Sequence, residues 1–140
     1  LLDDFYQRFQ HVPLVIDKWF ALQAMIEDDE AIARVRQLLH HRAFTTSNPN
    51  RVRALLATFA SSNLRGFHHP DGSGYRLLAE IARDLDARNP QLASRLLAPL
   101  GRWRRYDAQR QQRLRDELER IARTPGLSKD SYEVVTKSLA

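Results

Sequence analysis

Apolar residues recur at intervals of three and four along the whole sequence, and this spacing constrains the fold more than any other feature. Such spacing places apolar side chains on one face of a helix, whereas a half-buried strand would alternate them at every second residue. The apolar stripes are short, and proline, glycine and asparagine separate them. The sequence therefore predicts an all-α protein of about eight helices arranged in antiparallel pairs.

Two predicted helix starts have the same design and lie about 40 residues apart. Asn48-Pro49 begins one helix and Asn89-Pro90 begins the other. An asparagine side chain can cap a helix, and proline suits the first helical position because its missing N–H leaves nothing unpaired. The interval fits a two-helix repeat of the HEAT or armadillo type. We therefore expect the pairs to form a superhelical array.

Length and composition narrow the class of protein further. The 140 residues predict a single helical domain spanning residues 1–140. The absence of cysteine excludes disulfides and thiolate chemistry, and it fits a cytoplasmic location. No apolar run approaches the roughly 20 residues of a membrane helix, so no membrane partner is expected. Because the first residue is leucine rather than methionine, we interpret the chain as a fragment of a longer protein.

The net charge of +5 permits nucleic-acid binding without requiring it. The best candidate is the basic run 102–123, in which Trp103 and Tyr106 could stack on bases. Carboxylates alternate with the arginines of this run, and pairs such as Asp116 and Arg120 have the i, i+4 spacing of neighbours on a helix surface. A solvated, self-neutralising helix face is the preferred interpretation, and we expect no nucleic-acid partner.

The sequence contains no recognisable metal site or catalytic group. The histidines occur as adjacent pairs, His40-His41 and His68-His69, and adjacent residues of a helix do not share a face. No H-E-x-x-H motif is present. We therefore predict no catalytic residue, no metal ligand and no cofactor within these residues.

Candidate ligand-binding residues cluster around the helix that Asn48 is expected to cap. The side chains of Arg51 and Arg53 project from the first turn of this helix, where the helix dipole disfavours positive charge. Their presence is therefore explained by an acidic partner, a carboxylate ligand or water. Arginine suits carboxylates because its planar fork can bind both oxygens. Arg53 and Arg95, each placed early in a helix opened by Asn-Pro, are the main candidates, and Asn48 and Asn50 are weaker ones. Structural salt bridges are the competing explanation.

Four blocks of sequence carry a family resemblance, namely residues 13–20 (PLVIDKWF), 41–51 (HRAFTTSNPNR), 71–75 (DGSGY) and 88–95 (RNPQLASR). Together they resemble the C-terminal domain of bacterial aminopeptidase N, which belongs to the gluzincin family of zinc-dependent aminopeptidases. The resemblance extends over essentially the whole chain, to Ala140.

The resemblance implies a role without catalysis. In that family an H-E-x-x-H motif and a distant glutamate bind zinc, a G-A-M-E-N motif holds the substrate amine, and neither motif occurs here. It implies a C-terminal fragment that is inactive alone, with zinc in the full-length enzyme, and a helical superhelix that caps the active site and encloses a chamber. Its partners would be the catalytic domain of the same chain and a peptide substrate. Arg53 and Arg95 match arginines that face this chamber.

Two alternatives stay open at the level of sequence. A free-standing α-solenoid that binds a protein partner would have the same helical pattern, and a basic helical domain that binds nucleic acid would have the same charge. The reading frame upstream of Leu1 distinguishes these alternatives from the peptidase domain, because only the latter predicts H-E-x-x-H and G-A-M-E-N there.

Overall fold

A computed structural model describes residues 1–140 and consists of helices without strands, as the sequence predicted. In chain order the elements are α1 (Leu2–Phe9), α2 (Pro13–Ala24), α3 (Ala31–Leu39), α4 (Pro49–Val52), η1 (Arg53–Ala57), α5 (Thr58–Ser62), α6 (Leu64–Phe67), α7 (Ser73–Asp86), α8 (Pro90–Leu96), η2 (Leu100–Arg105), α9 (Ala108–Ala122) and α10 (Lys129–Leu139). The contacts divide the chain into two compact units, Leu1–Gly66 and Phe67–Ala140. A single domain over residues 1–140 stays a prediction.

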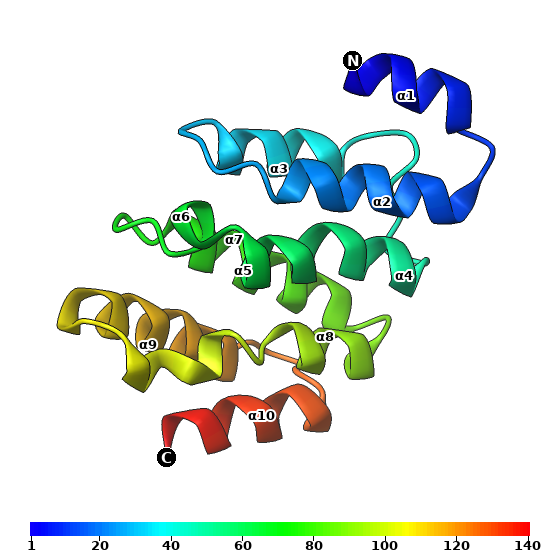
Figure 1. Ribbon diagram of the computed structural model, residues 1–140. Coiled ribbons are helices and arrows are strands. Elements are labelled where there is room, and N and C mark those ends of the chain that lie inside the picture. Colours follow the sequence, from blue (N-terminus) through cyan, green and yellow to red (C-terminus); the bar gives the residue numbers. More distant parts are fainter. The chain divides into compact units, whose positions relative to one another are not determined.

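Helix α2 is the central element of the first unit and packs against α1, α3, α4, η1 and α5. Its sequence is apolar around most of the helix, and this predicts a deep position. Ile16, Phe20 and Ala24 are fully or almost fully buried, and Trp19 is nearly so. Figure 1 shows α2 running beside α3. The first unit is therefore built around α2.

The helix that begins at Pro49 continues to Ser62 but changes its winding in the middle. Helix α4 leads into a π-helical turn, η1, and then into α5, and Figure 1 shows the ends of this segment, labelled α4 and α5. The backbone N–H of Thr58 donates to the carbonyl oxygen of Arg53, five residues earlier. A π turn of this kind is a local insertion that often lies at functional positions. Nothing in the apolar periodicity indicated it.

In the second unit, α7 packs against α8 and α9, while α10 packs against α8, α9 and η2. A turn precedes α7, in which Gly72 has φ +77° and Asp71 Oδ1 accepts a hydrogen bond from Ser73 N at 2.8 Å. The segment between Ser62 and Ser73 contains the short helix α6. The fully buried side chains of this unit are mainly those of Phe67, Tyr75, Leu77, Leu78, Leu85, Leu97 and Leu100.

A buried carboxylate joins α7 to the start of α10. Asp86 accepts hydrogen bonds from Ser128 N at 2.7 Å, from Ser128 Oγ at 2.6 Å and from Ser131 Oγ at 2.6 Å. Burial alone would raise the pKa of Asp86, but these hydrogen bonds outweigh burial and hold its pKa below the usual value. Ser128 is also the N-cap of α10, because its hydroxyl accepts a hydrogen bond from Ser131 N. This carboxylate therefore fixes the position of α10 against α7.

A membrane-spanning segment would have to be longer and more apolar than any helix of this chain.

Candidate functional site

Both predicted Asn-Pro helix starts are confirmed. Asn48 Oδ1 accepts a hydrogen bond from Arg51 N at 3.2 Å, and Asn89 Oδ1 accepts one from Leu92 N, also at 3.2 Å. Proline occupies the first turn in each case. The side chain of Asn48 is thereby used to cap α4, and this structural role is sufficient to explain it.

Arg51 does not face a ligand, because its side chain is buried within the first unit. Its Nε donates to Asp17 Oδ1, one of its terminal nitrogens donates to the carbonyl oxygen of Ala43, and its guanidinium lies 5.6 Å from the ring centroid of Phe20. The residue is only 7% exposed. Of the three explanations left open by the sequence, an internal acidic partner applies to Arg51.

Arg53 has a different environment, although it follows Arg51 by only two positions. It is exposed at the start of the π turn, and its only hydrogen bond from the side chain goes to Asn50 Oδ1, at 3.1 Å. No carboxylate of the chain pairs with it. The structure therefore brings Asn50 and Arg53 together and leaves the guanidinium able to bind an external anion.

Arg95 is also exposed, and its side chain makes no hydrogen bond or ion pair. We expected it early in its helix, but α8 ends at Leu96, so Arg95 lies in the last turn. A cation in the last turn is favoured by the helix dipole and needs no partner to explain it. Arg53 belongs to the first unit and Arg95 to the second, so each is considered separately.

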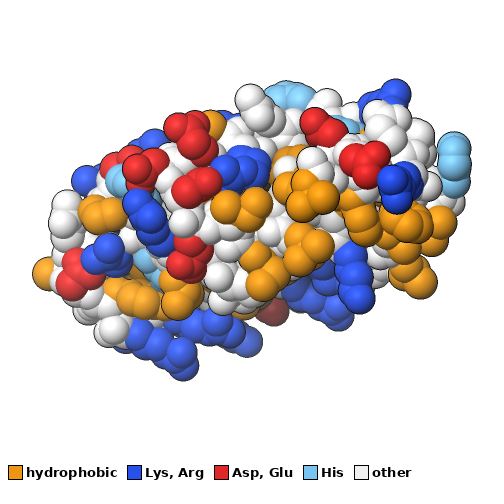
Figure 2. Space-filling view, turned by 45° about the horizontal axis from the view of Figure 1, so that its top comes forward, with side chains coloured by type: hydrophobic (Ala, Val, Ile, Leu, Met, Phe, Trp, Pro, Cys, Tyr) orange, Lys and Arg blue, Asp and Glu red, His pale blue; other side chains and the backbone are white.

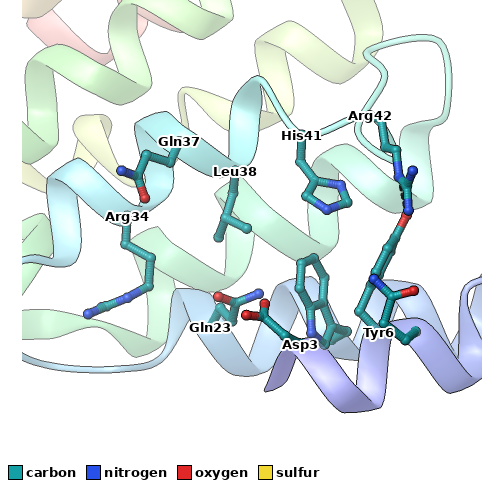
Figure 3. A pocket seen from close by; sticks show the side chains of 10 residues that line it. Asp3, Tyr6, Gln23, Arg34, Gln37, Leu38, His41 and Arg42 are labelled. Carbon is teal, nitrogen blue, oxygen red and sulfur yellow. Dashed lines mark hydrogen bonds between the residues drawn. The ribbon is translucent and has the colours of Figure 1, made fainter. Parts of the chain in front are cut away.

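The first unit also contains a pocket of about 600 Å³ between α1, α2 and α3. Figure 3 shows side chains from all three elements pointing into it, among them Gln23, Leu38 and His41. The residues lining it are Asp3, Tyr6, Gln7, Trp19, Gln23, Arg34, Gln37, Leu38, His41 and Arg42. The volume is in the range of small-molecule sites.

The polar groups of this pocket are only partly satisfied by the protein. Arg34 pairs with Asp28 at 2.6 Å, and Arg42 Nε donates to the hydroxyl of Tyr6 at 3.2 Å. In contrast, Nε2 of Gln23 is buried and has no hydrogen-bond partner. An unpaired buried donor is uncommon because it costs about 1–3 kcal/mol. The pocket therefore offers a hydrogen bond that the folded chain does not use.

His41 forms the aromatic part of the pocket with neighbouring rings. Burial lowers the pKa of His41, the positive charge of Arg42 lowers it further, and Asp3 opposes this. The imidazole is therefore neutral at pH 7. His41 Nδ1 accepts a hydrogen bond from Ala43 N at 3.0 Å, which places the ring proton on Nε2. Sequence reasoning considered His41 only as a metal ligand and missed the pocket, because α1, α2 and α3 form it jointly.

The basic segment beginning at residue 102 does not present its aromatic rings for stacking. Trp103 is buried, its indole N–H donates to Ser138 O at 2.8 Å, and Arg104 lies 4.2 Å from its ring centroid. Tyr106 packs against His68 with 4.5 Å between the ring centroids. On the face seen in Figure 2, basic side chains are interspersed with acidic and hydrophobic ones. These contacts favour a structural role for the segment.

The ion pairs of α9 do not include the expected pair of Asp116 and Arg120. Arg120 pairs with Glu117 at 2.8 Å, and Arg115 lies 3.7 Å from Glu119, whereas Asp116 accepts a hydrogen bond from Gln112. Some arginines of the run are thus paired with its carboxylates, but through other partners than the sequence suggested. Elsewhere in the chain, no three histidine, cysteine, aspartate or glutamate side chains converge to form a metal site. The residues present therefore do not fit zinc.

Comparison with known proteins identifies relatives of the whole chain. The model of a family described as "Domain of unknown function (DUF3458_C) ARM repeats" matches residues 1–140, and this agrees with the predicted armadillo-type repeat. Aminopeptidase N of Escherichia coli is 49% identical over 140 residues, and aminopeptidase N of Haemophilus influenzae is 48% identical over 139 residues. A crystal structure of Legionella pneumophila aminopeptidase A in complex with aspartic acid has a TM-score of 0.94 and 37% identity over 99% of this chain.

These relatives are much longer than this chain. The chain covers 16% of the length of each aminopeptidase N and 16% of the aminopeptidase A chain. The comparisons therefore establish that this chain is related to one helical part of these proteins.

Proposed function

Because this chain belongs to the DUF3458_C family of ARM-repeat domains, we propose that it is the non-catalytic C-terminal domain of a zinc metallo-aminopeptidase that removes N-terminal residues from peptides. The observation that carries the proposal is 45–49% identity to three bacterial aminopeptidases N over 99–100% of the chain. At this level of identity the relatives share a fold and, by extension, a place within the enzyme.

The domain caps the active site and encloses the substrate chamber. A peptide bound by its amino end directs its carboxylate away from the catalytic centre, and an unpaired anion in a partly enclosed space is unfavourable. The exposed, unpaired guanidinium groups of Arg53 and Arg95 supply the matching cations. Charge-assisted hydrogen bonds of this kind contribute about 1.5–3 kcal/mol. Asn50 assists by holding the guanidinium of Arg53.

The catalytic chemistry belongs to the rest of the enzyme. No cluster of ligands for zinc exists in these residues, so zinc and the groups that act on the peptide bond belong to a catalytic domain of the same, longer chain. Its location is the cytoplasm, and its physiological partners are that catalytic domain and peptide substrates.

The test uses the full natural chain that contains these residues, with the 140-residue chain assayed in parallel. We expect the full chain to release N-terminal residues from peptides, to lose this activity on dialysis against a chelator and to regain it with zinc. The 140-residue chain should be inactive. A full natural chain without aminopeptidase activity, or zinc-dependent activity in the purified 140-residue chain, would contradict the proposal.

A further inference from the structure

The pocket between α1, α2 and α3 is lined by hydrogen-bond donors that have no partner within the protein. Gln23 Nε2 is buried without a partner, and the neutral imidazole of His41 carries its proton on Nε2 because Nδ1 accepts from Ala43. Arg42 uses Nε for the hydroxyl of Tyr6, and this leaves its terminal nitrogens without a protein partner. Figure 3 shows these side chains together with Asp3 around the same cavity. Such donors suit a carboxylate.

The pocket also contains one carboxylate that the protein leaves unpaired. Asp3 lines the cavity and makes no hydrogen bond or ion pair, and it is close enough to His41 to influence the pKa of the imidazole. Arg34, the other cation of the lining, is already neutralised by Asp28. The charges available to a ligand are therefore one cation, Arg42, and one anion, Asp3.

The same pocket also has an apolar surface, formed by aromatic rings. The rings of Tyr6 and Trp19 are 4.9 Å apart, and the ring of His41 lies 4.7 Å from that of Tyr6 and 5.1 Å from that of Trp19. The indole N–H of Trp19 is used by the carbonyl oxygen of Leu2, so Trp19 offers only its ring. Leu38 completes this surface. It suits a small aliphatic or aromatic side chain.

We propose that this pocket binds a free α-amino acid with an apolar side chain. The carboxylate is bound by Gln23, His41 and Arg42, the ammonium group by Asp3, and the side chain by the rings. A volume of about 600 Å³ accommodates one such molecule. The site lies wholly within the first unit and includes neither Arg53 nor Arg95, so the proposal does not depend on the proposed role of those arginines.

Isothermal titration calorimetry on the full natural chain tests the proposal, with leucine as the ligand. Two analogues separate the charges: 4-methylpentanoate lacks the ammonium group, and 3-methylbutylamine lacks the carboxylate. Gln23→Leu and Arg42→Gln each remove one donor of the site, and we expect each to weaken leucine binding by ~10-fold or more. Lys18→Gln, an exposed change of the same charge in the same unit, should leave binding unchanged.

A second measurement separates binding from folding. Gln23→Leu removes an unsatisfied buried donor, so the melting temperature without ligand should stay the same or rise. Leucine should raise the melting temperature of the wild-type protein more than that of Gln23→Leu. A leucine-binding event that is identical in wild type, Gln23→Leu and Arg42→Gln belongs to another site and overturns the proposal, as does the absence of leucine binding. Equal binding of either analogue would overturn the assignment of a zwitterion.

Discussion

Asp17 on α2 accepts a hydrogen bond from Nε of Arg51 at the start of α4, across 34 positions of sequence. The two side chains are 17% and 9% exposed, so the ion pair is largely shielded from water. The same guanidinium also donates a hydrogen bond to the carbonyl oxygen of Ala43. This arrangement fixes the loop before α4 and hence the direction in which the next turn projects Arg53.

Replacing Arg51 should destabilise the fold strongly. Arg51→Met leaves the carboxylate of Asp17 and the carbonyl of Ala43 without their partner, and we expect a loss of about 3 kcal/mol in the free energy of unfolding. Urea denaturation measures this. Arg53→Ala in the same helix is the matched control, with an expected change within about 0.5 kcal/mol. Similar losses in the two variants would mean that Arg53 is also structural.

Asp86 should make the free energy of unfolding depend on pH in the acidic range. Since hydrogen bonds lower its pKa below the usual value of 3.8, its contribution is present above about pH 4 and is lost as the pH falls through the lowered pKa. Asp86→Asn should cost about 2 kcal/mol at pH 7, because an amide cannot accept from three donors in the same way. Urea denaturation at pH 7 and at about pH 2 should show this difference shrinking in acid.

The control for this change is Asp84→Asn, which lies on the same helix. Asp84 is exposed and pairs with Arg88 at 3.1 Å, so its loss should change stability by less than about 1 kcal/mol at either pH. If the two variants behave alike, the buried carboxylate does not hold α10 against α7.

His68 should also make the free energy of unfolding fall on acidification, but at a pH nearer neutrality than Asp86 does. Burial lowers its pKa, and Arg110 lowers it further, so the folded protein binds fewer protons at this site than the unfolded chain. The contribution of His68 to the free energy of unfolding is therefore fully present above about pH 6.5 and declines as the pH falls below that value. His68→Gln should remove part of this decline, as thermal unfolding between pH 5 and pH 8 would show. An unchanged pH profile would exclude His68 as a source.

The raised pKa of Tyr75 provides a spectroscopic check on its contact with His68. Its hydroxyl lies 2.6 Å from Nδ1 of His68, and burial raises the pKa of Tyr75 to about 12. Ultraviolet difference titration should therefore find one tyrosine that ionises well above the usual value of about 10. Tyr75→Phe should remove that transition and leave the others in place.

Local chemistry explains which parts of the structure the sequence predicted. Asn48 and Asn89 cap helices as expected, because a cap needs only its own next three residues. The burial of Arg51 was not predicted, since its partner Asp17 is remote in sequence. The pocket between α1, α2 and α3 was not predicted for the same reason. Gln23 has the sequence character of an exposed polar residue, and it lines a pocket only because α1 and α3 lie beside α2.

The short length of α8 shows a second limit of sequence reasoning. The repeat with the first Asn-Pro start predicted that Arg95 lies early in its helix, but Leu97 already leaves the helical segment, and Arg95 is in its last turn. Where a helix ends depends on how the following chain packs, and the sequence indicates helix ends only approximately. The exposure of Arg53 and Arg95 likewise becomes visible only in the folded chain.

The central claim is that Arg53 and Arg95 position the carboxyl end of a peptide, and substrate kinetics of the full natural enzyme test it most directly. Arg53→Ala and Arg95→Ala should each raise KM for peptides with a free carboxylate by ~10-fold or more, since one charge-assisted hydrogen bond is lost. The KM of small chromogenic amino-acid amides, and the zinc content, should be nearly unchanged. Equal losses on both kinds of substrate, or no loss on either, would contradict the claim.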